Sequence, residues 1–139
     1  MAGVADRVES RLRKLNRLGD IELPKDFVLP SYEGYGLANV SPTILEHFGV
    51  ATTTKGLADE VVGPHLRDSR RVVVILLDAC GYLLLKRILA DEPDHPFRSL
   101  IRSGRMTPLT SVFPSTTFGL SGAREILQSA ELSHYDKVR

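Results

Sequence analysis

The chain has 139 residues, of which 42% are hydrophobic and 25% charged, and its formal net charge is +1. This size and composition are typical of one globular domain or part of one. The small net charge gives no electrostatic reason to expect a nucleic-acid or membrane-surface patch. No run approaches the roughly 20 apolar residues of a membrane-spanning helix, and the single cysteine, Cys80, excludes an internal disulfide. Residues 1–17 lack the apolar stretch of a secretory signal, so we expect a cytoplasmic protein.

The first 19 residues form the first expected unit. Their apolar residues recur at helical spacing, with charged residues between them: Val4, Val8, Leu12, Leu15 and Leu18. A glycine at position 19 is suited to end such a helix. We therefore predict an amphipathic helix within residues 1–19, which packs on the rest of the chain or on a partner. Residues 20–139 form the second unit.

Turn-forming residues and helix signals follow in the next part of the chain. Prolines and glycines predict an extended, turn-rich segment over residues 20–36. The Ser-Pro pair at 41–42 is typical of the start of a helix, which we expect to end at Gly49. A weaker helix is predicted over residues 56–62, ended by Pro64.

The apolar run at residues 72–77 is the clearest element, because it is rich in β-branched residues and does not alternate with polar ones. Such a run is typical of a strand buried on both faces of a parallel sheet. Helices over 82–89 and 97–101 and a second strand over 105–113 would complete a strand–helix–strand unit. A helix over 120–130 follows. We therefore predict an α/β fold, part of a mostly parallel sheet with helices on both faces.

Polar residues that could carry chemistry follow both predicted strands. Asp78 comes directly after the first strand, where a carboxylate can bind a cation or simply cap the next helix. Ser115, Thr116 and Thr117 follow the second strand, where an activated hydroxyl can act as a nucleophile or cap a helix. Since Asp78 and Thr117 would follow neighbouring parallel strands, we expect both in one crevice at the carboxyl ends of the strands.

Two motifs resemble those of a known family. Residues 73–81, with the sequence VVILLDACG, resemble the first-strand motif of type I phosphodiesterases and nucleotide pyrophosphatases of the alkaline phosphatase superfamily. Residues 110–117, with the sequence TSVFPSTT, are similar to the nucleophile segment of that family. Residues 35–49 also resemble a leader found in some prokaryotic members. The resemblance covers residues 26–117 and implies an alkaline-phosphatase-like fold that this chain contains only in part.

The resemblance implies metal-dependent hydrolysis of a phosphodiester, a nucleotide pyrophosphate or a related phosphate ester. Thr117 would be the nucleophile, with Thr116 as the second choice, and would form a phosphothreonine that is then hydrolysed. Asp78 and Thr117 would be ligands of two divalent metal ions, usually zinc in this family. A threonine in place of cysteine or serine at this position argues against a sulfatase.

The sequence has few of the further ligands that such a metal site needs. The family supplies additional Asp and His ligands well after the nucleophile, whereas this sequence ends at Arg139. Its histidines are His47, His65, His95 and His134. None has a spacing typical of a shared metal, and a zinc site normally has three or four protein ligands. We therefore expect weak or absent metal binding by this chain alone, and a truncated sequence.

Three interpretations of this incomplete site remain open. The chain is a piece of a hydrolase, a subunit whose partner chain supplies the missing ligands, or a non-catalytic interaction module. Cys80 could act as a nucleophile between a strand and a helix, but a structural cysteine is favoured because no histidine is placed beside it. We also expect oligomers or aggregation, because the apolar run at 72–77 would lie near unpaired sheet edges.

Overall fold

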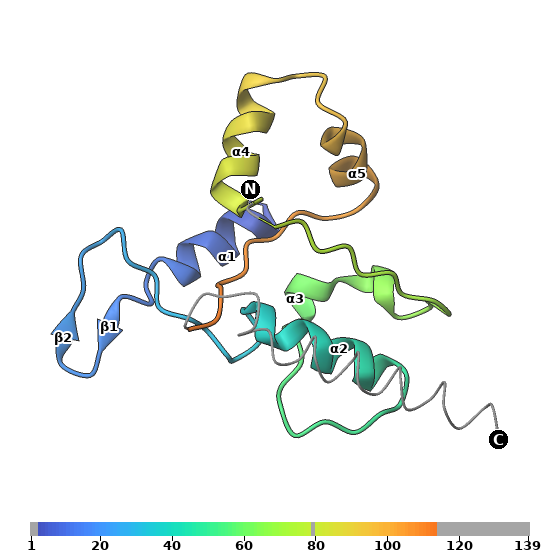
Figure 1. Cartoon of the computed structure of the whole chain (residues 1–139), viewed down its shortest axis with the longest axis horizontal. Helices are drawn as coiled ribbons and strands as arrows, with labels where there is room; N and C mark the ends of the chain where they lie inside the picture. The colour runs from blue at the N-terminus through green and yellow to red at the C-terminus, as the bar shows by residue number, and fades with distance from the viewer. Residues whose placement is uncertain (1–2, 79, 114–139) are drawn as a thin grey trace.

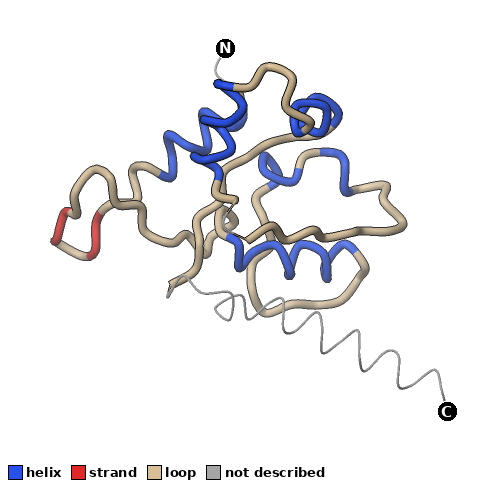
Figure 2. Tube along the Cα trace, turned by 45° about the horizontal axis from the view of Figure 1, so that its top comes forward, coloured by secondary structure: helices blue, strands red, loops and turns tan. Residues whose placement is uncertain are grey.

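The computed structural model of the chain describes residues 3–78 and 80–113 (Figure 1). In this part the helices are α1 (Val4–Leu12), α2 (Val40–His47), α3 (Asp59–Val62), α4 (Tyr82–Asp91) and α5 (Phe97–Ser103). Two 3-10 helices are η1 (Leu37–Asn39) and η2 (Pro64–Leu66), and the strands are β1 (Arg17–Leu18) and β2 (Ile21–Glu22). Figure 2 shows that loops connect these short elements over much of the trace. In Figure 1, α4 and α5 stand at one end of the molecule and α2 and α3 at the other.

The predicted parallel sheet is wrong for the described part of the chain. β1 and β2 form an antiparallel hairpin, in which Leu18 lies opposite Ile21. Parallel pairing among the described residues is limited to one isolated bridge between Gly36 and Thr110. These residues therefore do not form an alkaline-phosphatase-like fold, nor a sheet with helices on both faces.

Residues 72–77, predicted as a buried strand, form an extended loop (Figure 1). The side chains of residues 73–77 are 52–83% exposed. Branched side chains favour extended backbone, but a strand also needs a neighbour to pair its N–H and C=O groups, and no described segment pairs with this one. The second predicted strand, residues 105–113, is likewise a loop apart from the bridge at Thr110.

The predicted N-terminal amphipathic helix is confirmed as α1, but it is shorter than expected. Val8 and Leu12 are its buried residues, and Arg13 is its C-cap. Gly19 does not end this helix. It lies in the two-residue turn between β1 and β2 with a φ of 60°, a conformation that glycine adopts without steric cost.

The other helices agree in position with the expected ones but differ at their ends. α2 starts at Val40, directly after η1, and ends before Gly49, whose φ is 79°. α3 covers only the last four residues of the weaker predicted helix, and α4 and α5 each run two residues beyond the predicted end. The helix expected over 120–130 lies outside the described residues.

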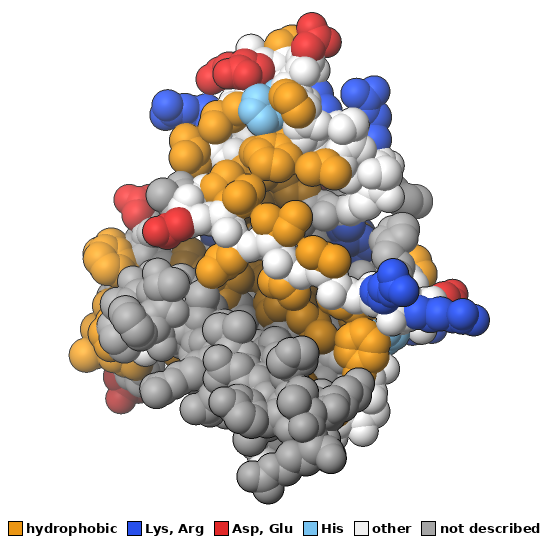
Figure 3. All heavy atoms as spheres, turned by 45° about the vertical axis from the view of Figure 1, so that its right-hand side comes forward, with side chains coloured by type: hydrophobic (Ala, Val, Ile, Leu, Met, Phe, Trp, Pro, Cys, Tyr) orange, Lys and Arg blue, Asp and Glu red, His pale blue; other side chains and the backbone are white. Residues whose placement is uncertain are grey.

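The core of the described structure is small. Its buried apolar residues are Val8 and Leu12 of α1, Leu89 of α4 and Val112. The space-filling view in Figure 3 shows many hydrophobic side chains on the surface instead. Polar contacts around α1 and the loop that precedes α2 also connect distant parts of the described structure.

Candidate functional site

The predicted catalytic residues fall on both sides of the boundary of the described structure. Asp78 lies in an exposed turn shortly before α4. The N-cap residue of that helix is Gly81. Thr116 and Thr117 lie outside the described residues, as does Ser115. Whether Asp78 and Thr117 share one crevice therefore stays a prediction.

The described residues do not by themselves fit the metal site that the resemblance implies. No three His, Cys, Asp or Glu side chains among them lie close enough together to hold a metal ion. Zinc normally takes three or four protein ligands, and Asp78 is the one described residue that the motifs nominate. His47 instead lies with Nε2 2.6 Å from the carbonyl oxygen of Ser69, and His95 Nδ1 accepts the Phe97 N–H at 3.2 Å.

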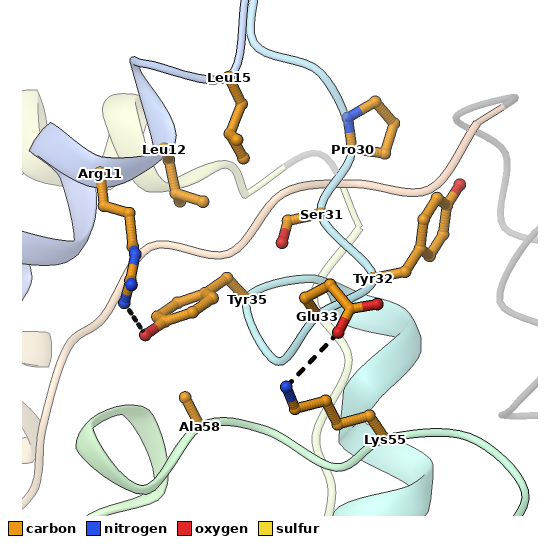
Figure 4. Close-up of a pocket in the computed structure, with 10 residues that line it drawn as sticks. All are labelled: Arg11, Leu12, Leu15, Pro30, Ser31, Tyr32, Glu33, Tyr35, Lys55 and Ala58. Atoms are coloured by element: carbon orange, nitrogen blue, oxygen red, sulfur yellow. Dashed lines mark hydrogen bonds and ion pairs between the residues drawn. The ribbon is translucent and has the colours of Figure 1, made fainter.

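A cavity of about 600 Å³ lies between α1, the loop at residues 30–35 and the segment at residues 55–58 (Figure 4). Leu12 and Leu15 contribute apolar surface from one side, and Pro30 from the loop. Arg11 and Lys55 contribute positively charged side chains. The cavity thus combines an apolar lining with basic groups, although the three segments that form it are far apart in the sequence.

Three side chains form a hydrogen-bonded cluster at the edge of this cavity. The hydroxyl of Tyr35 donates to Oε1 of Glu60 at 2.6 Å. Arg11 donates from Nη1 to the same carboxylate oxygen at 3.3 Å and to the Tyr35 hydroxyl. Its guanidinium carbon lies 4.8 Å from the centre of the Tyr35 ring, within reach of a cation–π attraction. The hydrogen bond to Glu60, together with burial, raises the pKa of Tyr35, so this hydroxyl stays protonated.

A buried amide fixes the loop that lines the cavity. Asn39 is only 2% exposed, and its Oδ1 accepts the N–H of Gly36 at 3.0 Å. Its Nδ2 donates to the carbonyl oxygens of Tyr32 and Lys55, both at 2.7 Å. Buried polar groups are stable only when they are hydrogen-bonded in this way. Asn39 therefore holds two of the three segments of the cavity in fixed positions.

Residues 110–113 dock on the same loop. The Thr110 N–H donates to the carbonyl oxygen of Tyr35 at 2.9 Å, and the Thr110 hydroxyl accepts the N–H of Ser31 at 2.8 Å. The N–H of Phe113 donates to the hydroxyl of Tyr32 at 3.2 Å. Residues 110–113 are the first half of the nucleophile motif, so this docking fixes the position of that half.

A second polar cluster joins α1 to α4. Glu9 accepts hydrogen bonds from Lys86 at 2.7 Å, from Arg13 at 2.8 Å and from the Tyr82 hydroxyl at 3.2 Å. The hydrogen bond from Lys86, followed by that from Arg13, lowers the pKa of Glu9 to about 2. This cluster attaches α4 to the rest of the described structure.

Sequence reasoning missed both polar clusters and the cavity. Arg11 is 24 positions from Tyr35 and 49 from Glu60. No local pattern reports such contacts, because arginine, tyrosine and glutamate at this spacing are equally compatible with separate surface positions. The amphipathic pattern of α1 was the one available signal, since it predicted that one face of this helix packs either on the rest of the chain or on a partner.

Comparison with protein-family models, with curated proteins and with solved structures found no match to this chain. The resemblance to type I phosphodiesterases therefore rests on the motifs at residues 73–81 and 110–117. In the described part of the chain, every helix is too short or too polar to cross a membrane.

Proposed function

We propose that this chain takes part in the hydrolysis of a phosphodiester, a nucleotide pyrophosphate or a related phosphate ester. Thr117 is the proposed nucleophile, and Thr116 is the alternative. The order and separation of the two motifs support this activity. The observation that carries the proposal is the position of Asp78, an exposed carboxylate in the turn that links the apolar segment 73–77 to α4. A carboxylate in such a place is suited to bind a divalent cation.

The proposed activity requires ligands from polypeptide other than the described residues, because the described residues do not complete a metal site. The segment at 73–77 gives a reason to expect such polypeptide beside Asp78. Five consecutive apolar side chains are 52–83% exposed there, and burial of apolar surface stabilises by roughly 25 cal/mol per Å². We propose that further polypeptide covers this segment and brings metal-ligating side chains close to Asp78.

The test uses the protein as its native source produces it, together with any chain that co-purifies. Hydrolysis of bis-(p-nitrophenyl) phosphate is measured with zinc and after chelation. We expect Thr117→Ala to reduce hydrolysis to the background rate, because it removes the nucleophile, while the neighbouring change Ser115→Ala leaves it intact. We expect Asp78→Asn to raise the zinc concentration that half-maximal activity requires. Activity that survives both Thr117→Ala and Thr116→Ala would contradict the proposal.

A second candidate function is non-catalytic binding of another polypeptide through segment 73–77. The exposure of this apolar segment favours it, as does the lack of a metal-binding group among the described residues. The N-terminal helix is a poorer docking surface than we expected, because α1 buries Val8 and Leu12 within the chain. In this case Ile75→Asp abolishes co-purification of the partner, whereas no zinc binds stoichiometrically and Thr117→Ala has no effect.

We further propose a cytoplasmic location. Cys80 is a free and exposed thiol, and exposed thiols persist most readily in a reducing compartment. Fractionation of the native source with an antibody against the chain tests this, and recovery in an oxidising compartment would contradict it.

A further inference from the structure

We propose that the cavity beside α1 binds a small amphipathic anion, a molecule with an apolar ring system and one carboxylate or phosphate group. The cavity is lined by residues that neither motif contains, and the proposal does not depend on the hydrolysis proposed above.

The size and lining of the cavity match an apolar ligand body. Its volume of about 600 Å³ lies within the range of small-molecule sites, which is roughly 300–1,000 Å³. Leu12 and Pro30 line it from two sides, and the Tyr35 ring lies between Arg11 and Lys55 (Figure 4). Aromatic rings bind flat apolar groups by stacking or edge contacts as well as by area.

The charged side chains that line the cavity then favour a ligand that carries an anionic group on its apolar body. The cavity lining carries two cationic side chains, Arg11 and Lys55, against one carboxylate, Glu33, while the Glu60 carboxylate that pairs with Arg11 lies outside the lining. Towards described residues Arg11 uses only Nη1, so the donors on Nε and Nη2 can form a paired contact with a carboxylate or phosphate.

Lys55 is available for the same group. Its ion pair with Glu33 spans 3.4 Å, and the two side chains are 62% and 83% exposed. Exposed pairs of this kind contribute little stability, so an anion in the cavity can replace Glu33 as the partner.

The groups that line the cavity are also held in position before a ligand binds. Glu60 and the Tyr35 hydroxyl fix the position of Arg11, and Asn39 fixes the backbone at Tyr32 and Lys55. A site whose groups are already in position loses less conformational entropy on binding, which favours affinity.

The experiment is calorimetric titration of the full chain with three probes that share a naphthalene ring: 2-naphthoate, 2-naphthylmethylphosphonate and the uncharged 2-naphthalenemethanol. We expect at least one of the two anions to bind once per chain, about tenfold more tightly than the alcohol, because charge-assisted contacts to Arg11 add to the apolar ones. The two anions together show which anionic group the cavity prefers. The alcohol reports binding to apolar surface alone, including the exposed segment at 73–77.

Matched variants locate the site. Arg11→Met should weaken binding of the anion about tenfold and leave binding of the alcohol unchanged. Lys14→Met removes one exposed charge outside the cavity and should change neither. Lys55→Met should also weaken anion binding, and it breaks only an exposed ion pair, so it decides the question if Arg11→Met does not fold. Failure of both anions to bind, equal binding of the alcohol, or unchanged affinity in Lys55→Met would each overturn the proposal.

Discussion

The loop at residues 30–39 and the segment at residues 73–77 reverse the usual relation between polarity and burial. The loop carries Asn39, which is 2% exposed, and it holds Thr110, which is 6% exposed. The segment consists of valine, isoleucine and leucine, yet its side chains are 52–83% exposed.

The difference lies in the partners that each region finds. Backbone N–H groups of the loop donate to Asn39 Oδ1 and to the Thr110 hydroxyl, and Asn39 Nδ2 donates to the carbonyl oxygen of Lys55, so these polar groups are satisfied away from water. The apolar segment has no strand partner among the described residues. Apolar composition creates a tendency to bury a segment, but only a complementary surface allows it.

The largest expected effect comes from adding a side chain at Gly36, where there is no room for one. A Cβ atom there would overlap the carbonyl oxygen of Ser31, a backbone atom held in place by the loop. We expect Gly36→Ala to lower the free energy of unfolding by about 3 kcal/mol, measured by urea denaturation. Gly81→Ala is the control, because a Cβ at that position meets no atom within 4 Å. Equal effects of the two changes would show that the loop is not tightly packed.

The next effect compares the same substitution at a buried leucine of α1 and at an exposed leucine of segment 73–77. Leu12 is 5% exposed and Leu76 is 60% exposed. We expect Leu12→Ala to lower the free energy of unfolding by about 2 kcal/mol, because it leaves a cavity under α1. Leu76→Ala should change it by less than about 0.5 kcal/mol. Thermal melts of both variants measure the difference, and a larger loss at Leu76 would mean that segment 73–77 is buried in the protein in solution.

A smaller effect is the pH dependence that Glu9 contributes to the free energy of unfolding. The folded-state pKa of about 2 lies below the ordinary value of 4.5. Glu9 therefore contributes stability that is fully present above pH 4.5 and is lost as the pH falls towards 2. Because Lys86 and Arg13 are half exposed, solvent screening reduces the contribution to about 1 kcal/mol.

Urea denaturation at pH 6 and pH 3 tests this contribution. We expect the wild-type chain to lose more stability between the two values than Glu9→Gln does. The control is Glu33→Gln, whose ion pair is exposed, and it should follow the wild type. An identical pH dependence in Glu9→Gln and the wild type would show that Glu9 does not contribute to the pH dependence of stability.

The smallest expected effect on stability is also the most informative about segment 73–77. Ile75 is 78% exposed, so Ile75→Lys should change the free energy of unfolding by less than about 0.5 kcal/mol. It should nevertheless reduce self-association, because a charge interrupts the apolar run that favours intermolecular contact. Light scattering across a concentration series measures this, and unchanged association would place the contact elsewhere.

Local sequence patterns were sufficient for most helices. The apolar spacing of residues 4–18 predicted α1, which ends earlier than expected, and the Ser-Pro pair and Gly49 predicted α2 to within two residues at its start. These signals work because a helix satisfies its backbone hydrogen bonds within one segment. The sequence also placed Asp78 between an apolar segment and a helix, as the structure has it.

Tertiary structure alone decided the rest. Residues 72–77 have the composition of a buried strand, but strand pairing depends on a second segment that composition does not reveal. The cavity likewise depends on Arg11, Tyr35 and Lys55 meeting from distant positions. The sequence by itself therefore determined the helices and the order of the motifs, because both are local. Which surfaces are buried, and which charges meet, was decided by non-local contacts that only the folded chain brings together.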